Sequence, residues 1–304
     1  MKSKLLSRGA LIVLFCLTTG LVFAQDAAEE PMAAIEPRAV VYGEVGGVEL
    51  LLNVYEPALS DSPRAAVVLI HGGAGKYGER RELAEYASRL AAAGYVVFNI
   101  DYRLLQDDGN KRWPAQLEDA QLAVRWVRAN AAQYHVDPDQ ICALGHSFGG
   151  QLAALLGERD TLFDTDLPLA MYSSKVACVI DIAGSVDPLR PFNDVRLQPI
   201  ATALYGGTPN DARETYLSAS ALAQVDASTS PFLIFHGADD EVNPVEQSRE
   251  MVDALHRAGV EVVYVEVPHA THLYWISPFE ITGAWDLVAP EMLAFLGRHL
   301  HSPS

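Results

Sequence analysis

Ser147 lies in a sequence pattern that is typical of a nucleophile. It is the central residue of Gly145-His146-Ser147-Phe148-Gly149, between an apolar run at 141–144 and a helix-forming run at 151–156. Small residues permit a sharp strand-to-helix turn that exposes the serine hydroxyl, and the helix N-terminus favours developing negative charge. The pattern therefore predicts that Ser147 is a nucleophile; a glycine-rich turn with a capping serine is the alternative.

Backbone amides that stabilise an oxyanion are predicted near this serine. The segment His71-Gly72-Gly73-Ala74-Gly75 directly follows an apolar run at 66–70, and its small residues let an oxygen approach the backbone. We expect the amide of Phe148 and an amide at Gly73 or Ala74 to be the donors, a role worth about 3 kcal/mol per donor where it has been measured. An ordinary glycine turn is the alternative interpretation of the segment.

An acid that orients the catalytic base should follow a later strand. Residues 232–235 are apolar, and Asp239 and Asp240 come shortly after them. Asp240 is favoured because it lies closer to the helix start at Asn243-Pro244, while Asp239 stays open because one residue of loop geometry decides between them. Two less favoured positions follow the preceding strand, Asp181 and Asp187.

The base is expected after the last predicted strand, residues 262–267. Pro268 leads into a loop that contains two histidines, His269 and His272. His272 is favoured because it lies far enough past the proline to turn back toward the site, whereas His269 would face outward or brace the loop. Serine, acid and base then occur in the expected order along the chain.

Alternating strand-like and helix-like segments position these residues. Continuous apolar runs predict strands buried on both faces, and helical spacing of apolar residues predicts helices between them. The predicted strands are 41–45, 49–55, 66–70, 95–101, 141–144, 176–182, 232–235 and 262–267, and the predicted helices are 79–93, 114–132, 151–156, 245–258 and 285–299. Repeated β-α-β units predict an α/β class fold, a doubly wound, mostly parallel sheet with helices on both faces. Residues 184–230 are less regular and are expected to form a small wall or lid.

The N-terminal residues predict an export signal. A basic start precedes an apolar stretch that is short for a membrane span and ends at the small residue Ala24. We therefore expect a signal peptide over 1–24, cleaved after Ala24, and a secreted or periplasmic protein; a retained anchor is the alternative. Residues 25–38 predict a flexible acidic Ala/Pro-rich tether, and residues 39–304 one folded domain.

Composition restricts the partners and cofactors. The 304 residues include 22 Lys or Arg and 39 Asp or Glu, a net charge of −17. Such an acidic chain repels nucleic acid and anionic lipid, so neither nucleic acid nor a stable membrane partner after signal removal is expected. The sequence has no metal-ligand spacing, Walker motif or dinucleotide fingerprint, and thus indicates no cofactor and no metal. Cys142 and Cys178 lie in apolar runs and are interpreted as buried thiols or as a disulfide pair.

Together these features resemble the esterase and lipase group of α/β-hydrolases, and most closely its carbohydrate-esterase branch of bifunctional acetylxylan and feruloyl esterases. The resemblance extends from about Val41 to Leu300. The motifs that carry it are His71-Gly72-Gly73-Ala74, Asp101-Tyr102-Arg103-Leu104, Trp113-Pro114 with Glu118-Asp119-Ala120, Val124-Arg125-Trp126-Val127-Arg128, Gly145-His146-Ser147-Phe148-Gly149-Gly150, His236-Gly237-Ala238-Asp239-Asp240 and His272. Related chains differ at Ala74-Gly75 and at Leu105-Gln106-Asp107-Asp108, which affects the expected substrate rather than the fold.

The resemblance implies a serine carboxylesterase that forms an acyl-enzyme, with Ser147 as nucleophile, Asp240 as acid and His272 as base. The implied substrate is a small-molecule or carbohydrate ester of acetyl or feruloyl type. Asp101-Tyr102-Arg103 is expected to brace the oxyanion loop through a buried ion pair. Two alternatives remain. One is a serine exopeptidase of prolyl-peptidase type, and the other is a non-catalytic binding protein on a hydrolase scaffold.

Overall fold

The computed structural model describes residues 35–58, 62–161, 163, 168–277 and 281–300. The expected signal peptide and residues 25–34 of the expected tether lie outside the described residues. The first strand begins at Arg38. Among the described residues, no helix combines the length and the apolar character that crossing a membrane requires.

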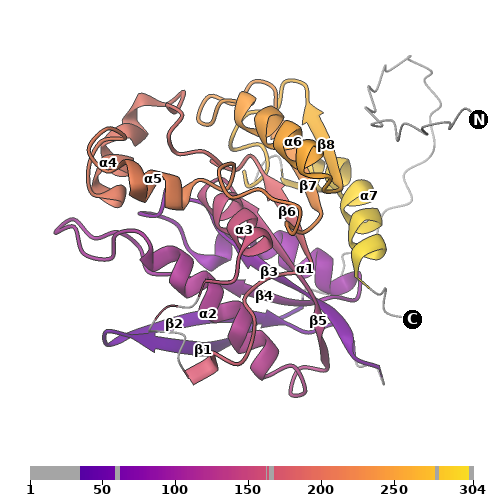
Figure 1. Cartoon of the computed structure of the whole chain (residues 1–304). Helices are drawn as coiled ribbons and strands as arrows, with labels where there is room; N and C mark the ends of the chain where they lie inside the picture. Colours follow the sequence, from indigo (N-terminus) through magenta and orange to yellow (C-terminus); the bar gives the residue numbers. More distant parts are fainter. Residues whose placement is uncertain (1–34, 59–61, 162, 164–167, 278–280, 301–304) are drawn as a thin grey trace, which may run out of the picture. The chain divides into compact units, whose positions relative to one another are not determined.

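Eight strands form one sheet in the described part of the chain (Figure 1). They are β1 (Arg38–Val45), β2 (Val48–Tyr55), β3 (Arg64–Ile70), β4 (Val96–Ile100), β5 (Val136–His146), β6 (Cys178–Ile182), β7 (Phe232–Gly237) and β8 (Val262–Val267). Their spatial order is β1-β2-β4-β3-β5-β6-β7-β8. Strand β2 runs antiparallel to β1 and β4, and the other neighbours are parallel.

The strand order brings the ends of β3 and β5 together. The chain moves outward from β3 to β4 and then returns to place β5 on the other side of β3, so that Ile70 pairs with Gly145. In open α/β sheets, ligands bind at the carboxyl ends of the strands where the order reverses in this way. The segments that follow β3 and β5 therefore meet at the expected position of a site.

Helices cover both faces of the sheet. They are α1 (Ala84–Ala92), α2 (Ala115–Ala129), α3 (Phe148–Glu158), α4 (Gln198–Tyr205), α5 (Arg213–Ala219), α6 (Glu246–Ala258) and α7 (Ile281–His299). Buried side chains of α2, α3 and α6 form the apolar core on one face, and those of α1 and α7 form the core on the other. The predicted doubly wound α/β fold with helices on both faces is confirmed.

Residues between β6 and β7 form the irregular segment. It contains a 3₁₀ turn at Val195–Leu197 and the short helices α4 and α5. The two helices lie next to each other in Figure 1, and the rings of Tyr205 and Tyr216 pack 4.5 Å apart between them. The segment thus folds as a wall of short helices.

Local geometry shifts some predicted boundaries. The expected helix at 79–93 begins as a 3₁₀ turn, Arg80–Leu83, and continues as α1. Pro114 precedes α2 as its N-cap and does not lie within the helix, and α2 ends three residues early because Asn130 caps it by donating to the carbonyl oxygen of Trp126 at 2.8 Å. Hydrogen bonds of this kind end helices without changing the apolar pattern.

Cys142 and Cys178 face each other across β5 and β6. The two residues are register partners in the parallel pair, and both side chains are fully buried. They are free thiols with sulfur atoms 2.6 Å apart. Burial, followed by the hydrogen bond with Cys178, raises the pKa of Cys142 well above its ordinary value.

Candidate active site

The turn at Ser147 depends on close backbone packing. Ser147 has φ 57° and ψ −120°, an unfavourable conformation for an L-residue, and its N–H donates to the carbonyl oxygen of Ile182 at 2.9 Å. A Cβ on Gly149 would lie 2.0 Å from the carbonyl oxygen of Ile70 on β3. One on Gly145 would lie 2.0 Å from the carbonyl oxygen of Gly149. Only glycine at these positions lets β5, α3 and β3 meet this closely.

Ser147, His272 and Asp240 are linked by hydrogen bonds. The Oγ of Ser147 lies 2.9 Å from Nε2 of His272, and Nδ1 of His272 lies 2.7 Å from Oδ2 of Asp240. All three residues are buried or nearly so. Since Nδ1 of His272 faces a carboxylate, it carries the proton, which leaves Nε2 free to accept the serine proton. This is the geometry that serine activation requires.

The Asp240 carboxylate is surrounded by donors. Its Oδ1 accepts the backbone N–H groups of Val242 and Asn243, both at 2.8 Å. Burial alone would raise the pKa of Asp240, but hydrogen bonds from His236 and His272 outweigh it and hold this pKa well below its ordinary value. Asp240 is therefore ionised throughout the neutral range.

The neighbouring candidates lie elsewhere. Asp239 pairs with His269 at 3.2 Å on the surface, where these side chains are 59% and 90% exposed. Asp187 is part of a loop in which its Oδ1 accepts the backbone N–H of Leu189. Asp181 is fully buried under the first turn of α3, where burial raises its pKa to about 7 against the weaker opposing effect of His236. The structure joins none of these three carboxyl groups to His272.

The loop after β3 presents Ala74 to the site. Ala74 has a φ of 54° and lines the cavity beside Ser147, whereas Gly73 is not among the lining residues. Among the described residues, no acceptor pairs with the backbone N–H of Ala74 or of Phe148. Both amides are thus available to an oxyanion beside the strand-to-helix turn at Ser147.

Tyr102 and its neighbours brace this loop. The Tyr102 hydroxyl lies 3.0 Å from the carbonyl oxygen of His71 and 2.8 Å from that of Gly72, and the Tyr102 ring stacks on His71 at 4.3 Å. Arg103 binds the buried carboxylate of Asp119, with Nε 2.9 Å from both oxygens. The structure thus shows the bracing role expected of Tyr102, and the ion pair that accompanies it holds the adjoining segment to α2.

Two further residues, His146 and Glu241, hold the backbone of His272. Nε2 of the buried His146 lies 3.1 Å from the His272 carbonyl oxygen, and the Glu241 carboxylate accepts the His272 N–H at 3.1 Å. Burial lowers the pKa of His146 to about 3, so its imidazole is neutral. Both residues are adjacent in sequence to predicted site residues, which is the one signal that could have identified them.

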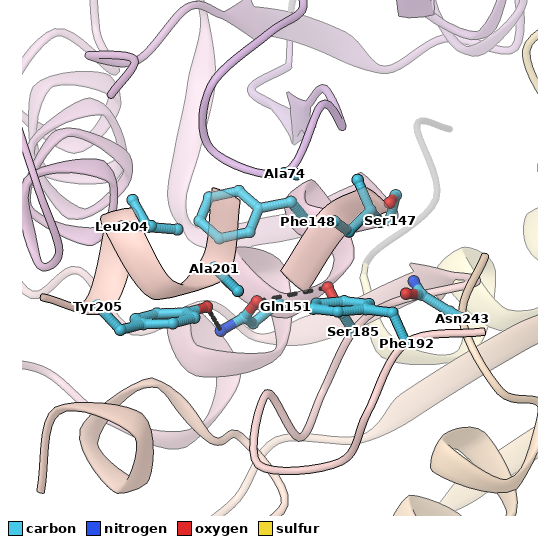
Figure 2. A pocket seen from close by; sticks show the side chains of 11 residues that line it. Ala74, Ser147, Phe148, Gln151, Ser185, Phe192, Ala201, Leu204, Tyr205 and Asn243 are labelled. Carbon is cyan, nitrogen blue, oxygen red and sulfur yellow. Dashed lines mark hydrogen bonds between the residues drawn. The ribbon is translucent and has the colours of Figure 1, made fainter. Parts of the chain in front are cut away.

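A small cavity of about 20 Å³ opens beside Ser147 (Figure 2). Gln151 of α3 lies in its wall and donates to the Tyr205 hydroxyl at 3.2 Å and to the carbonyl oxygen of Ala219 at 2.7 Å. These hydrogen bonds hold the wall of short helices, α4 and α5, against α3. The cavity is lined by Ala74, Ser147, Phe148, Gln151, Ser185, Phe192, Leu197, Ala201, Leu204, Tyr205 and Asn243.

Comparison with known proteins gives one consistent family. Residues 52–255 match the family model BD-FAE. The chain is 33% identical to esterase LipC of Mycobacterium tuberculosis over 251 residues, covering 78% of this chain and 60% of LipC. It is 30% identical to esterase LipQ of the same organism over 277 residues, covering 87% and 62%. The chain therefore spans about 60% of the length of these curated relatives.

A solved structure extends the comparison. Esterase 2 of Thermogutta terrifontis phosphonylated by sarin superposes with a TM-score of 0.75 at 27% identity, covering 90% of this chain and 99% of that one. The same esterase with propionate bound gives a TM-score of 0.73 at 27% identity, covering 88% and 97%. Since the family model matches residues 52–255, more than half of this chain, the chain belongs to the BD-FAE family of the α/β-hydrolase fold.

Proposed function

We propose that this protein is a carboxylic ester hydrolase that acts through an acyl-enzyme. The single observation that carries the proposal is the chain of hydrogen bonds from Ser147 through His272 to Asp240. The names of the relatives LipC, LipQ and the Thermogutta esterase support the same activity.

The proposed mechanism follows from this chain. His272 removes the proton from the Ser147 hydroxyl, whose oxygen attacks the ester carbonyl carbon, and the amides of Ala74 and Phe148 stabilise the oxyanion. Collapse breaks the bond to the alcohol oxygen, which takes the proton from His272, and the acyl group stays on Ser147. Water, activated by His272, then attacks the acyl carbon and releases the acid.

The cavity supports a small acyl group. It is lined by both proposed oxyanion donors and by Ser147 but not by His272, which must face the leaving oxygen, so it holds the acyl side of the ester. A volume of about 20 Å³ accommodates about one water-sized group. Acetyl-type esters are therefore favoured over feruloyl esters, with a small or carbohydrate alcohol. The Thermogutta esterase structure with propionate bound is in line with a short acyl group.

Export is the second part of the proposal. It rests on the basic, apolar and small-residue pattern that ends at Ala24. The mature protein is then secreted or periplasmic and begins at Gln25. N-terminal sequencing of protein recovered from the periplasm or medium tests this, and an intact N-terminus in the exported protein would contradict it.

Ser147→Ala tests the activity. Nitrophenyl esters from acetyl to octanoyl, methyl ferulate and aminoacyl-proline amides are assayed with wild-type and variant protein. We expect turnover to be greatest for acetyl and to fall by at least about 10⁴-fold in the variant, because removal of a catalytic serine costs about 10⁶-fold in kcat in a well-studied serine hydrolase. A fluorophosphonate probe should label wild type and not the variant.

Each alternative has its own outcome in this assay. Faster cleavage of aminoacyl-proline amides than of esters would identify an exopeptidase. A wild-type protein that neither turns over any ester nor reacts with the probe would be a binding protein on a hydrolase scaffold, and the proposed activity would be wrong.

A further inference from the structure

His236 is a second histidine in contact with the Asp240 carboxylate. It occupies the end of β7 and is fully buried. Its Nε2 is 3.2 Å from Oδ2 of Asp240, the same oxygen that binds His272 at 2.7 Å. The two imidazoles therefore converge on one carboxylate oxygen, although the sequence interpretation gave His236 no role.

The partners of His236 require a proton on its Nε2. Nε2 faces only acceptors, the Asp240 carboxylate and the carbonyl oxygen of Asn243 at 3.3 Å, so it must carry a proton. Nδ1 lies 2.7 Å from the hydroxyl of Ser248 on α6 and forms a second hydrogen bond there. Ser248, His236 and Asp240 are thus joined by a buried chain of hydrogen bonds.

We infer that His236 is a positioning residue of the proposed esterase reaction, which orients the Asp240 carboxylate toward His272 by donating to Oδ2. The inference rests on the proposed function. Oδ1 is held by the amides of Val242 and Asn243, and His236 fixes the other oxygen. With both oxygens held, the carboxylate cannot rotate, and the remaining lone pair of Oδ2 points at His272.

Other titratable groups lie near His236. Asp181 on β6 and Glu266 on β8 interact electrostatically with it, and so does His146 on β5; α6 faces it with the uncharged Ser248. Asp240, in contrast, both receives a hydrogen bond from Nε2 of His236 and binds Nδ1 of His272. A change in His236 therefore reaches the reacting atoms through Asp240.

The test compares His236→Phe with His236→Gln. Phenylalanine fills the site without a donor, so we expect kcat for nitrophenyl acetate to fall by about 10- to 100-fold, the range seen when orienting partners are removed at metal sites, while KM changes by less than about 3-fold. The acid limb of the pH profile of kcat should move to higher pH, because a carboxylate with one donor fewer binds protonated His272 more strongly. Glutamine, whose Nε2 can donate from the same place, should restore kcat to within about 5-fold of wild type.

The ring nitrogens of the wild-type enzyme give an independent test. A ¹H–¹⁵N spectrum of the wild-type protein should show a proton on Nε2 of His236. This measurement does not depend on whether His236→Phe folds. An Nε2 that carries no proton, or a folded Phe variant with unchanged kcat and pH profile, would overturn the inference. An inactive wild type would instead refute the proposed activity, so the two failures are distinguishable.

Discussion

At the scale of single residues, two adjacent aspartates have opposite surroundings. Asp240 is buried among four donors, whereas the exposed Asp239 binds His269 on the surface. Their sequence context is the same strand end and the same loop. The difference arises because one residue of rotation in the loop turns one side chain inward and the other outward.

Asp240→Asn should reduce kcat for nitrophenyl acetate by about 10⁴-fold, because an amide at Oδ2 no longer stabilises the required tautomer or the protonated form of His272. Steady-state kinetics at neutral pH measure the effect, with fluorophosphonate labelling rates as a second readout.

Asp239→Asn is the matched control, one residue away, and should keep kcat within about 2-fold of wild type since exposed ion pairs contribute little. If the Asp239 variant lost activity and the Asp240 variant kept it, the assignment of the acid would be reversed.

Residues that act through other residues were the hardest to identify from sequence. Ser147 and Phe148 stand in a recognisable motif, and the chain order suggested Asp240 and His272. His236 and His146 act by contacts with segments distant in the chain. The position of His146 next to Ser147 is a weak signal, and the residue types alone do not distinguish these histidines from ordinary core residues.

At the scale of elements, the site depends on how closely α3 packs on the sheet. The first turn of α3 lies against the end of β3, and Gly149 is the residue at their contact. Gly149 has no positive φ, so its requirement is steric rather than conformational. Adding a single methyl group at Gly149 therefore tests whether this close contact between α3 and β3 is required.

Gly149→Ala should abolish esterase activity and lower the melting temperature by several degrees. A Cβ would lie 2.0 Å from the carbonyl oxygen of Ile70, so α3 must move away from β3 and carry Ser147 with it. Circular dichroism melts and nitrophenyl acetate turnover measure the two effects.

Gly283→Ala is the control for a glycine that lacks such a contact. Its Cβ would have no neighbour closer than 3.9 Å, within α7, so stability should be unchanged or higher by about 1 kcal/mol. Equal effects of the two substitutions would show that α3 tolerates displacement.

Strand positions were predictable because burial on both faces leaves a continuous apolar run. Strands β3, β4, β6 and β7 are almost entirely buried, and each matched such a run. Helix ends were less predictable, as at Asn130, where a capping bond decides the last turn. The arrangement of α4 and α5 could not be foreseen, since it follows from their contact with each other and with Gln151.

At the scale of the whole molecule, Asp181 couples stability to pH. The carboxyl group is fully buried on β6, and burial raises its pKa from 3.8 to about 7, with His236 opposing. A group whose pKa is raised on folding contributes stability that is fully present below its unfolded pKa and is lost as pH rises through the folded one. Asp181 therefore weakens the folded protein progressively between about pH 4 and pH 7.

Asp181→Asn should remove this loss. At pH 8 the variant should melt at least about 4 °C above wild type, given about 2 to 4 °C per kcal/mol for a protein of this size, and the difference should disappear by pH 4. Differential scanning calorimetry from pH 4 to pH 8 measures it. A difference in melting temperature between variant and wild type that is the same at every pH would contradict the role assigned to Asp181.

The sequence alone determined the fold class, the candidate nucleophile Ser147 at the end of a predicted strand, and the short list of candidate acids and bases. It could do so because apolar periodicity and turn residues are local properties that the chain carries wherever it folds. Only the tertiary structure shows that Asp240 and His272, and not Asp239 and His269, are joined to Ser147 by hydrogen bonds, and that Ala74 lines the cavity. It also decided the size of the cavity and the convergence of His236 and His272 on one oxygen, because hydrogen bonds and steric limits between distant segments exist only after the sheet has brought those segments together.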